Sequence, residues 1–332
     1  MDPFIVEVMR GQGVECSHIV HAALVNLELN KNEFFGNTTL KIFPRSSIKM
    51  IQAIPLIQTG AAEYFQVTDS ELAIACASHR GEYFHVEIVK NWLNKINLTE
   101  LNFECGTHSP SDPESFERLI QTGSKASPIH NNCSGKHTGM LATALYLNES
   151  LKGYTHSHHQ VQKRITETLN FFYNLDPKFT ISKLLDSAID GCSMPTFAVP
   201  LINLAVAMAY FGSCEKLNSE MADITKKVLS ACLKNPLITS GTGQYCSEIM
   251  KTLSDYKIFV KGGAEGVLTA ILPELKIGIA IKTQDGQIRA SELVLSHLFY
   301  RLGLLKEDSP FLKPVLANWS KLETGYLRLK RQ

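Results

Sequence analysis

The most informative segment of this chain is Phe43-Pro44-Arg45-Ser46-Ser47-Ile48-Lys49. It places a Ser-x-x-Lys tetrad between residues 38–43, which predict a short strand, and residues 50–62, whose apolar side chains recur at roughly helical spacing. The proline blocks continuation of the strand. Three positions apart on a helix, the serine and the lysine that frame the tetrad share one face, where a neutral amine can take the hydroxyl proton. A serine nucleophile is therefore expected at Ser46.

The tetrad by itself is a weak signal, because the chain contains it twice more. Ser213-Cys214-Glu215-Lys216 follows an apolar run, and Ser254-Asp255-Tyr256-Lys257 lies in a polar segment typical of a loop. Neither has the strand-turn-helix setting that presents a nucleophile. The context, more than the tetrad, favours Ser46.

Composition indicates an ordinary globular protein. The chain has 332 residues, 44% of them hydrophobic, and a formal net charge of +1. Because Lys and Arg are scattered, neither a nucleic acid nor a membrane is an expected partner. No apolar run approaches the ~20 residues of a spanning helix, and the first residues lack the pattern of a secretory signal. We expect a cytoplasmic protein.

The eight cysteines are expected to be free thiols, because a chain this long without a secretory signal seldom carries a disulfide framework. The absence of any Cys-x-x-Cys pair argues against a zinc ribbon. Cys133 and Cys192 can still meet in space, since metal ligands need not be close in sequence.

Strand-like segments lie near both ends of the chain, and the middle is rich in helix. Residues 4–9 and 19–29 have strand composition, residues 266–272 and 276–282 read as a hairpin, and residues 160–175 are the clearest amphipathic helix. We expect an α/β (α+β) fold in which both ends share one sheet, within a single catalytic unit. Its approximate lobes are a sheet lobe of residues 1–60 plus 255–332 and a mainly helical lobe of residues 61–254.

Two further segments can complete a serine-lysine site. Thr68-Asp69-Ser70-Glu71 is a capping box that starts an apolar helix, with Ser78 expected late on that helix. Lys261-Gly262-Gly263 follows the strand-like residues 257–260 and is similar to the Lys-Thr-Gly triplet of penicillin-recognising enzymes. Taken singly, these are also a polar residue near a helix end and a turn. Their order along the chain after Ser46 favours a shared site.

Reactive side chains gather in residues 127–137, directly before an apolar helix. The segment contains Cys133, Lys136 and His137, and the amides of its helix start can bind an anionic or oxyanionic group. A polar turn rich in helix caps explains its Asn and Ser, but not Cys, Lys and His together. Asp190 lies in a second polar turn, where a plain turn residue is the simpler interpretation.

Together these segments resemble one known family, the asparaginase II family of Rhizobium-type L-asparaginases. The resemblance runs over nearly the whole chain and includes the motifs F-P-R-S-S-I-K, C-A-S-H, H-N-N-C-S-G-K-H, D-G-C-S-M-P and V-K-G-G-A-E-G. It implies a β-lactamase/transpeptidase-like fold, similar to serine β-lactamases, penicillin-binding proteins and serine glutaminases. An antiparallel sheet built from both chain ends with a helix-rich middle agrees with that fold.

The resemblance also implies roles for individual residues. Two Ser-Lys pairs would carry catalysis, Ser46 with Lys49 and Ser78 with Lys261. Three side chains would contact the substrate: Arg45 and His137 would face it, and Asp190 would bind it. A Zn²⁺ site would use Cys133, Lys136 and Cys192, and the protein would be a homodimer without an organic cofactor. One departure is Gly262, where related sequences often have threonine.

The reaction implied by the resemblance is hydrolysis of the side-chain amide of L-asparagine to L-aspartate and ammonia. Lys49 and Lys261 in one pocket would disfavour two positive charges, so that one amine loses its proton below its free pKa of ~10.4. We expect Ser46 as the nucleophile, Lys49 as its base, and Ser78 with Lys261 as a relay to the leaving ammonia. The two pairs can also exchange these roles.

Three alternatives remain open at this point. A glutaminase or broader amidohydrolase differs by one substrate methylene, worth only ~1–3 kcal/mol of discrimination. A hydrolase that activates water on a metal would use His130, His137 and the two cysteines. A binding protein without catalysis should have lost one of the four serines and lysines, and none is lost.

Overall fold

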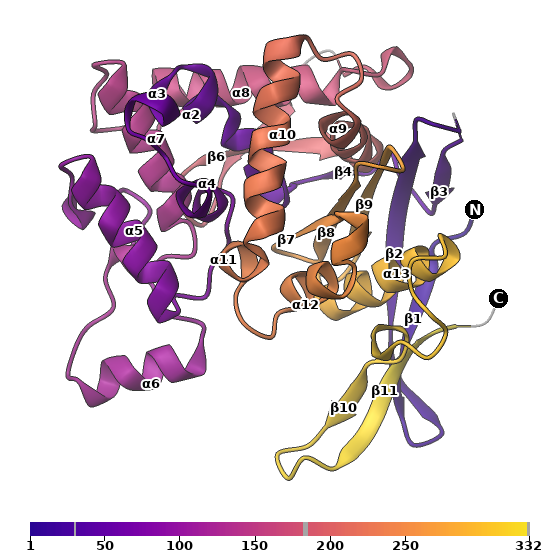
Figure 1. Cartoon of the computed structure of the whole chain (residues 1–332). Coiled ribbons are helices and arrows are strands. Elements are labelled where there is room, and N and C mark those ends of the chain that lie inside the picture. Colours follow the sequence, from indigo (N-terminus) through magenta and orange to yellow (C-terminus); the bar gives the residue numbers. More distant parts are fainter. Residues whose placement is uncertain (30, 182–184, 331–332) are drawn as a thin grey trace.

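The architecture is built around an antiparallel sheet whose strands come from both ends of the chain (Figure 1). The computed structural model describes residues 1–29, 31–181 and 185–330. The strands are β1 (Phe4–Arg10), β2 (Gly13–Asn26), β3 (Glu33–Phe35), β4 (Lys41–Ile42), β5 (Leu185–Ile189), β6 (Pro195–Pro200), β7 (Phe259–Gly263), β8 (Val267–Leu272), β9 (Ile277–Thr283), β10 (Val315–Ala317) and β11 (Glu323–Leu329). The α-helices are α1 (Lys49–Gln52), α2 (Ile54–Gln58), α3 (Ala61–Tyr64), α4 (Asp69–Ala75), α5 (Tyr83–Lys95), α6 (Pro113–Gln121), α7 (Ser134–Tyr146), α8 (Gln160–Tyr173), α9 (Leu201–Ser213), α10 (Ser219–Lys234), α11 (Pro236–Ser240), α12 (Tyr245–Thr252) and α13 (Ile288–Arg301).

The large sheet has the strand order β10-β11-β1-β2-β9-β8-β7, with β3 also paired to β2. Its described ladders are antiparallel. Strands from the first residues of the chain therefore lie between strands from the last ones, and the helices lie between them in sequence. This confirms the expected fold class. A second, three-stranded sheet, β4-β6-β5, was not expected from the sequence.

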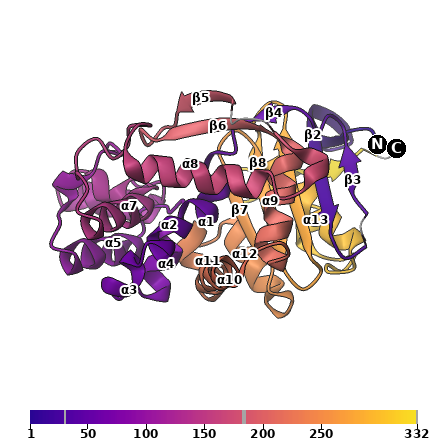
Figure 2. The ribbon, with the colours of Figure 1, turned by 90° about the horizontal axis from the view of Figure 1, so that it is seen from above.

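Helices cover both faces of the large sheet. β8 is buried at every position and β9 at all but one, as strands covered on both sides are. α9 packs on β9, β2 and β8, and α13 packs on β9 and β8 as well. α9 is buried on all sides from Leu201 to Phe211, which is the pattern of a helix inside a core. In Figure 2, α8 lies alongside α9 beneath the small sheet.

Elements with strong local signals match their predicted ranges closely. α8 buries Val161, Ile165, Leu169 and Phe172, the four residues that define its apolar face. The expected hairpin at residues 266–282 is β8 and β9. At the N-terminus of α4, Thr68 and Glu71 form both hydrogen bonds of the capping box. These features depend on side-chain period and cap chemistry, which the sequence contains directly.

The segments around Ser46 differ from their predicted form. The strand expected at residues 38–43 is only the two residues of β4, and Arg45–Ile48 is a turn of 3₁₀ helix. The single helix expected at residues 50–62 is divided into α1, α2 and α3. Pro55 near the start of α2 and Gly60, with φ +90° before α3, explain the breaks.

Two further expectations about local structure were wrong. α4 ends at Ala75, so that Ser78 lies beyond the helix in a segment without regular secondary structure. Lys261 lies inside β7, paired with Thr269 of β8, so that the strand continues past its expected end at residue 260. Ser78 therefore lies beyond a helix end, and Lys261 lies within a strand.

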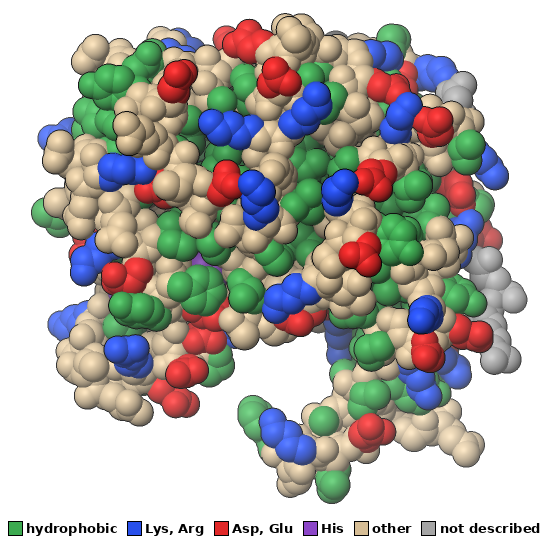
Figure 3. Space-filling model, in the orientation of Figure 1, with side chains coloured by type: hydrophobic (Ala, Val, Ile, Leu, Met, Phe, Trp, Pro, Cys, Tyr) green, Lys and Arg blue, Asp and Glu red, His purple; other side chains and the backbone are tan. Residues whose placement is uncertain are grey.

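All eight cysteines are free thiols, as expected. Within the part of the chain that the structure describes, no helix combines the length and the apolar character needed to cross a membrane. Lys and Arg are interspersed with Asp and Glu on the face shown in Figure 3, and the hairpin β10–β11 projects from the body at its lower edge.

The contact between the sheet and α9 yields a test of the core. A Cβ at Gly278 of β9 would lie 2.2 Å from Ala205 O and 2.2 Å from Ala209 N. Gly278→Ala must therefore push the helix away, and we expect a loss of about 1–3 kcal/mol in the free energy of unfolding, measured by urea denaturation. Gly13→Ala is the control, since its nearest atom would be 3.7 Å away. It should change stability by less than ~0.5 kcal/mol, and equal losses for both variants would contradict the tight contact.

Candidate active site

The amines of two buried lysines meet at one serine hydroxyl. Lys261 Nζ lies 2.8 Å from Ser78 Oγ, and Lys49 Nζ lies 3.2 Å from the same oxygen. The lysines are only 1% and 2% exposed, whereas Ser78 is half-buried. α1 supplies Lys49, β7 supplies Lys261, and the segment after α4 supplies Ser78. Three elements far apart in the sequence thus build one serine-lysine cluster.

Lys49 has the surroundings of an ammonium ion. Besides Ser78, its amine donates to the carbonyl oxygens of Ala77 and Asn132. Three acceptors match the three N–H groups of a charged lysine, which offsets the cost of burying the charge. Neither carbonyl could be identified from the sequence, because any residue can supply one.

The surroundings of Lys261 lower its pKa into the neutral range. Burial, and after it the positive charge of Lys49, lowers the pKa of Lys261 to about 7. Its amine contacts the Gly262 carbonyl at 3.0 Å in addition to Ser78. Near neutral pH, a large share of this amine is therefore a free base within hydrogen-bond distance of a hydroxyl.

The structure does not pair Ser46 with Lys49. Among the described residues no hydrogen bond of the Ser46 hydroxyl is found, and the side chain is half-buried at the rim of the cluster. Its neighbour Ser47 is buried, and the Ser47 carbonyl accepts from Thr269 Oγ1 at 3.1 Å. A Cβ at Gly263 would lie 2.6 Å from Pro44 O, so the glycine permits close approach of β7 to this segment. Both contacts hold the segment around Ser46 against β7, and no base within the described residues is hydrogen-bonded to the Ser46 hydroxyl.

Gly262, where related sequences often have threonine, is not a steric requirement. A Cβ there would meet its nearest atoms at 3.8 Å and 4.0 Å, which is ordinary van der Waals contact.

Arg45 and Asp190 form an ion pair at the rim of the cluster. Arg45 Nε and Nη2 lie 2.7 and 2.6 Å from Asp190 Oδ1, and the Gly191 amide donates to the same oxygen at 2.8 Å. Burial alone would raise the pKa of Asp190, but Lys136 and Arg45 hold it below its usual value. Arg45 adopts φ +53°, a left-handed conformation that is costly for a residue with a side chain. No described hydrogen bond reaches Oδ2, so this oxygen is free to accept one from a ligand.

Cys133, Lys136 and Cys192 come together as expected. Their side chains are 4%, 5% and 3% exposed, and Lys136 Nζ donates to Cys192 Sγ at 3.3 Å. A hydrogen bond from the Cys192 thiol is the main reason that the pKa of Cys133 falls well below its ordinary value. Burial alone would lower the pKa of Lys136, but the two cysteines and Asp190 raise it.

This donor set fits a soft divalent metal in position and in ligand type. Lysine becomes a ligand only after losing its proton, which Lys136 retains in these surroundings. Among the residues that the structure describes, no group of three or more His, Cys, Asp or Glu side chains is arranged to hold a metal. The two cysteines and Lys136 are therefore the set to consider.

His137 is buried behind the cluster and does not contact Ser78. Its Nδ1 lies 2.7 Å from the hydroxyl of Tyr154, and its Nε2 has no partner among the described residues. Burial, together with the charges of Lys136 and Lys49, keeps the pKa of His137 well below its ordinary value. The sequence did not suggest Tyr154, because one tyrosine in a polar segment carries no signal.

His79 and Ser134 form a second buried pair that the sequence analysis did not single out. Their atoms Nε2 and Oγ lie 2.8 Å apart, and the His79 amide donates to the Asn132 carbonyl. That carbonyl also accepts from Lys49. The only signal was the position of His79 directly after Ser78.

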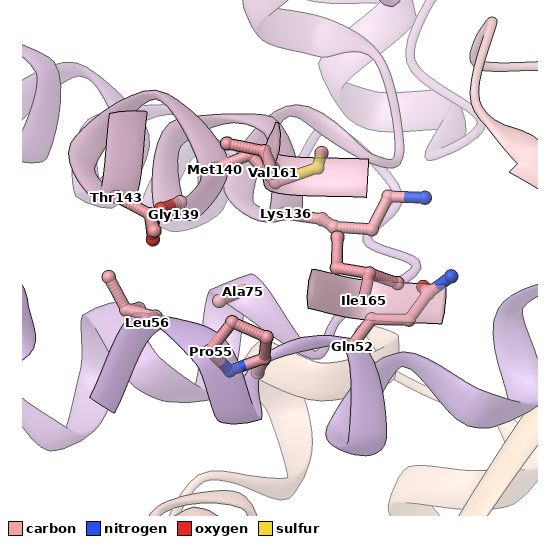
Figure 4. Close-up of a pocket in the computed structure, with 11 residues that line it drawn as sticks. Gln52, Pro55, Leu56, Ala75, Lys136, Gly139, Met140, Thr143, Val161 and Ile165 are labelled. Carbon is pink, nitrogen blue, oxygen red and sulfur yellow. Dashed lines mark hydrogen bonds between the residues drawn. The ribbon is translucent and has the colours of Figure 1, made fainter. Parts of the chain in front are cut away.

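A small cavity of about 10 Å³ lies behind Lys136, between α1, α2, α7 and α8 (Figure 4). Leu56, Met140 and Ile165 are among its lining residues, and the polar ends of Lys136 and Gln52 lie together at one end. Its volume is close to the minimum for one water molecule. The cavity is a packing gap beside the cluster and is too small to hold an amino acid.

Comparisons with known proteins show what this chain is similar to. A family model described as L-asparaginase II matches residues 6–329. Among solved structures, Mglu in its native form in the presence of 4.3 M NaCl is 12% identical with a TM-score of 0.46, over 88% of this chain and 63% of that chain. This chain thus spans about 63% of the length of Mglu.

Two further solved structures cover this chain more evenly. Bacillus glutaminase in the presence of 4.3 M NaCl is 13% identical with a TM-score of 0.39, over 86% of this chain and 91% of that chain. A beta-lactamase from Mycobacterium bovis is 11% identical with a TM-score of 0.40, over 91% of this chain and 96% of that chain. Among curated proteins, no sequence matches.

Proposed function

The chain belongs to the L-asparaginase II family, and we propose that it hydrolyses the side-chain amide of L-asparagine to L-aspartate and ammonia. The observation that carries the proposal is the lysine amine with a pKa of about 7 placed 2.8 Å from a serine hydroxyl. An activated hydroxyl of this kind is the requirement for nucleophilic attack on an amide at neutral pH. The cytoplasmic location and the homodimer stay predictions.

The geometry supports Ser78 as the nucleophile, in place of the expected Ser46. Neutral Lys261 takes the hydroxyl proton of Ser78, and Oγ forms a bond to the amide carbon. As this bond forms, the π electron pair of the carbonyl moves to the carbonyl oxygen, and the nearby amine of Lys49, which donates to Ser78 Oγ, offsets the negative charge of the tetrahedral intermediate. When the carbon–nitrogen bond breaks, Lys261 returns the proton to the leaving ammonia. Water then hydrolyses the acyl ester, with Lys261 again as the base.

Arg45 and Asp190 supply complementary charges for an amino-acid substrate. Asp190 Oδ2 can accept from an α-ammonium group, while Oδ1 remains bound to Arg45 and Gly191. Guanidinium N–H groups of Arg45 that Asp190 does not use can bind an α-carboxylate. The distance between this pair and Ser78 would decide between asparagine and glutamine.

The activity is tested by ammonia release from the purified full-length protein. L-Asparagine, L-glutamine and D-asparagine are supplied separately, and kcat/KM should be highest for L-asparagine. A higher value for L-glutamine would instead support the glutaminase alternative. No ammonia from any of the three would contradict the proposed function.

The serine assignment makes a separate prediction. Lys261→Met should lower kcat by roughly 10²–10⁴-fold, the contribution of a general base, and Ser78→Ala should lower it at least as much. Their double variant should be little worse than either single one, because the pair acts as a unit. Ser254→Ala is the control, since it removes an exposed serine from a chance Ser-x-x-Lys tetrad and should leave kcat unchanged.

The position of the covalent intermediate decides between the two serines. Rapid quenching and peptide mass mapping should place the acyl group on Ser78. An acyl group on Ser46, with Ser46→Ala inactive, would restore the original assignment of Ser46 with Lys49. Turnover that survives both serine substitutions would indicate water activated by a metal.

The pH dependence follows from the lowered pKa of Lys261. Because this amine must be deprotonated to act as the base, kcat/KM should rise with pH through a limb centred at about 7. Lys49→Met removes a neighbouring positive charge, so the pKa of Lys261 should increase and the limb should move to higher pH. Lys257→Met, at an exposed position, should not move it. A limb that stays in place in Lys49→Met would mean that burial alone sets this pKa.

We further propose that Cys133, Lys136 and Cys192 hold one Zn²⁺, with Lys136 releasing its proton as the metal binds. When bound, zinc would supply a Lewis acid. Its ligands would also link the start of α7 to the turn before β6. Elemental analysis should find about one zinc per chain after purification without added metal, and a chelator should lower the melting temperature. Cys192→Ser should abolish both effects, whereas Cys16→Ser, which changes an exposed thiol, should not. If the purified protein contained no zinc and added zinc left its melting temperature unchanged, the proposed site would be contradicted.

A further inference from the structure

The buried side chain of His137 has an unusual hydrogen-bond arrangement. Its residue is 0% exposed, Nδ1 is bonded to the Tyr154 hydroxyl at 2.7 Å, and Nε2 is left without a partner. A buried polar group without a hydrogen bond costs ~1–3 kcal/mol, so native proteins seldom retain one without a reason. Among the described residues, Nε2 of His137 is therefore available to bond with a group that the protein itself does not supply.

The neighbours of Tyr154 determine which nitrogen of His137 carries the proton. The Glu104 amide donates to the Tyr154 hydroxyl oxygen at 2.9 Å, so this oxygen already acts as an acceptor. Its own proton has His137 Nδ1 as the only described acceptor. Nδ1 must then be bare, and the imidazole proton must be on Nε2. In the opposite arrangement, with a proton on Nδ1, the tyrosine hydroxyl would have no acceptor.

The loop around Tyr154 is fixed by a dedicated set of contacts. The carboxylate of Glu104 accepts from the Gly153 amide at 2.6 Å and from Thr155 Oγ1 at 2.8 Å. Gln162 Nε2 donates to the Tyr154 carbonyl at 2.8 Å. Tyr154 is itself 0% exposed and packs edge-on against the His137 ring, with ring centroids 5.5 Å apart. Its hydroxyl thus has one available orientation.

We propose that Tyr154 is a positioning residue that fixes His137 in the Nε2-protonated tautomer, so that Nε2–H donates a hydrogen bond to an oxygen of the bound amino acid. The donor role rests on the proposed function, whereas the tautomer does not. A neutral N–H donor aimed by its neighbours binds an oxygen without adding a third buried positive charge to Lys49 and Lys136. Binding of the oxygen also gives a partner to Nε2, which the described residues leave without one.

The tautomer is tested by ¹⁵N NMR of full-length protein labelled at histidine. The His137 signals are assigned by their loss in His137→Asn. Protonated and bare ring nitrogens resonate far apart, and the wild type should show a proton on Nε2 and none on Nδ1. Tyr154→Phe should lose this preference and show a mixture or the reverse tautomer. Tyr173→Phe is the matched control, because Tyr173 is also buried but its hydroxyl has no partner, and it should keep the wild-type spectrum.

The donor role is tested with the same samples. Saturating L-aspartate should shift the Nε2 signal of the wild type, and Tyr154→Phe should lower kcat/KM for L-asparagine by about 2- to 12-fold, the value of one neutral hydrogen bond. Tyr173→Phe should leave kcat/KM unchanged. A proton on Nδ1 in the wild type, or an unaltered tautomer in Tyr154→Phe, would overturn the role of Tyr154. If saturating L-aspartate left the ¹⁵N shift of Nε2 unchanged, the donor role would be overturned.

The outcomes of the tautomer test are independent of the proposed activity. If no substrate released ammonia, the spectrum of the wild type would still decide the tautomer. If L-asparagine were hydrolysed and the tautomer were the reverse, only the present inference would fail.

Discussion

Two lysine amines share one serine hydroxyl in the protein interior, and this arrangement constrains much of the surrounding structure. Burying a second positive charge beside the first is unfavourable, so the two amines need different environments. Lys49 has three oxygen acceptors, whereas Lys261 lacks such a set and has a pKa of about 7. This difference between the two environments supports the proposed roles of Lys261 as the base and Lys49 as the stabilising charge.

The cluster must be assembled from three segments that cannot reach one another locally. Gly263 allows β7 to lie against Pro44, and the hydroxyl of Thr269 bridges the carbonyls of Ser47 and Lys261. The large sheet and α9 form the rigid support behind these contacts, since a Cβ at Gly278 would already strike the helix. The position of Ser78 relative to the two lysines thus depends on close packing several residues away.

A second group of charges extends the site toward the small sheet. Arg45 pairs with Asp190, and Lys136 lies near Asp190 and bonded to Cys192. Positive and negative groups alternate along this line, which allows several of them to be buried together. The strained backbone of Arg45 is held by its ion pair, and the pair in turn orders the turn that carries Cys192. The proposed substrate-binding pair and the proposed metal site are therefore connected through this turn.

The sequence by itself determined what depends on local pattern. The family, the mixed α/β class, the capping box at Thr68, the apolar face of α8 and the hairpin of β8 and β9 all follow from motifs, period or turn chemistry. The candidate site residues, among them the pair Ser78 and Lys261, came from the motifs and the family resemblance. The contact of Lys49 with Ser78 instead of Ser46 became visible only in the tertiary structure. Ser78 lies 29 positions from Lys49 and 183 positions from Lys261, and their contact depends on where α4 ends and on the register of β7 against β8. No local preference contains that information, because helix ends and strand register are set by the packing of the whole core.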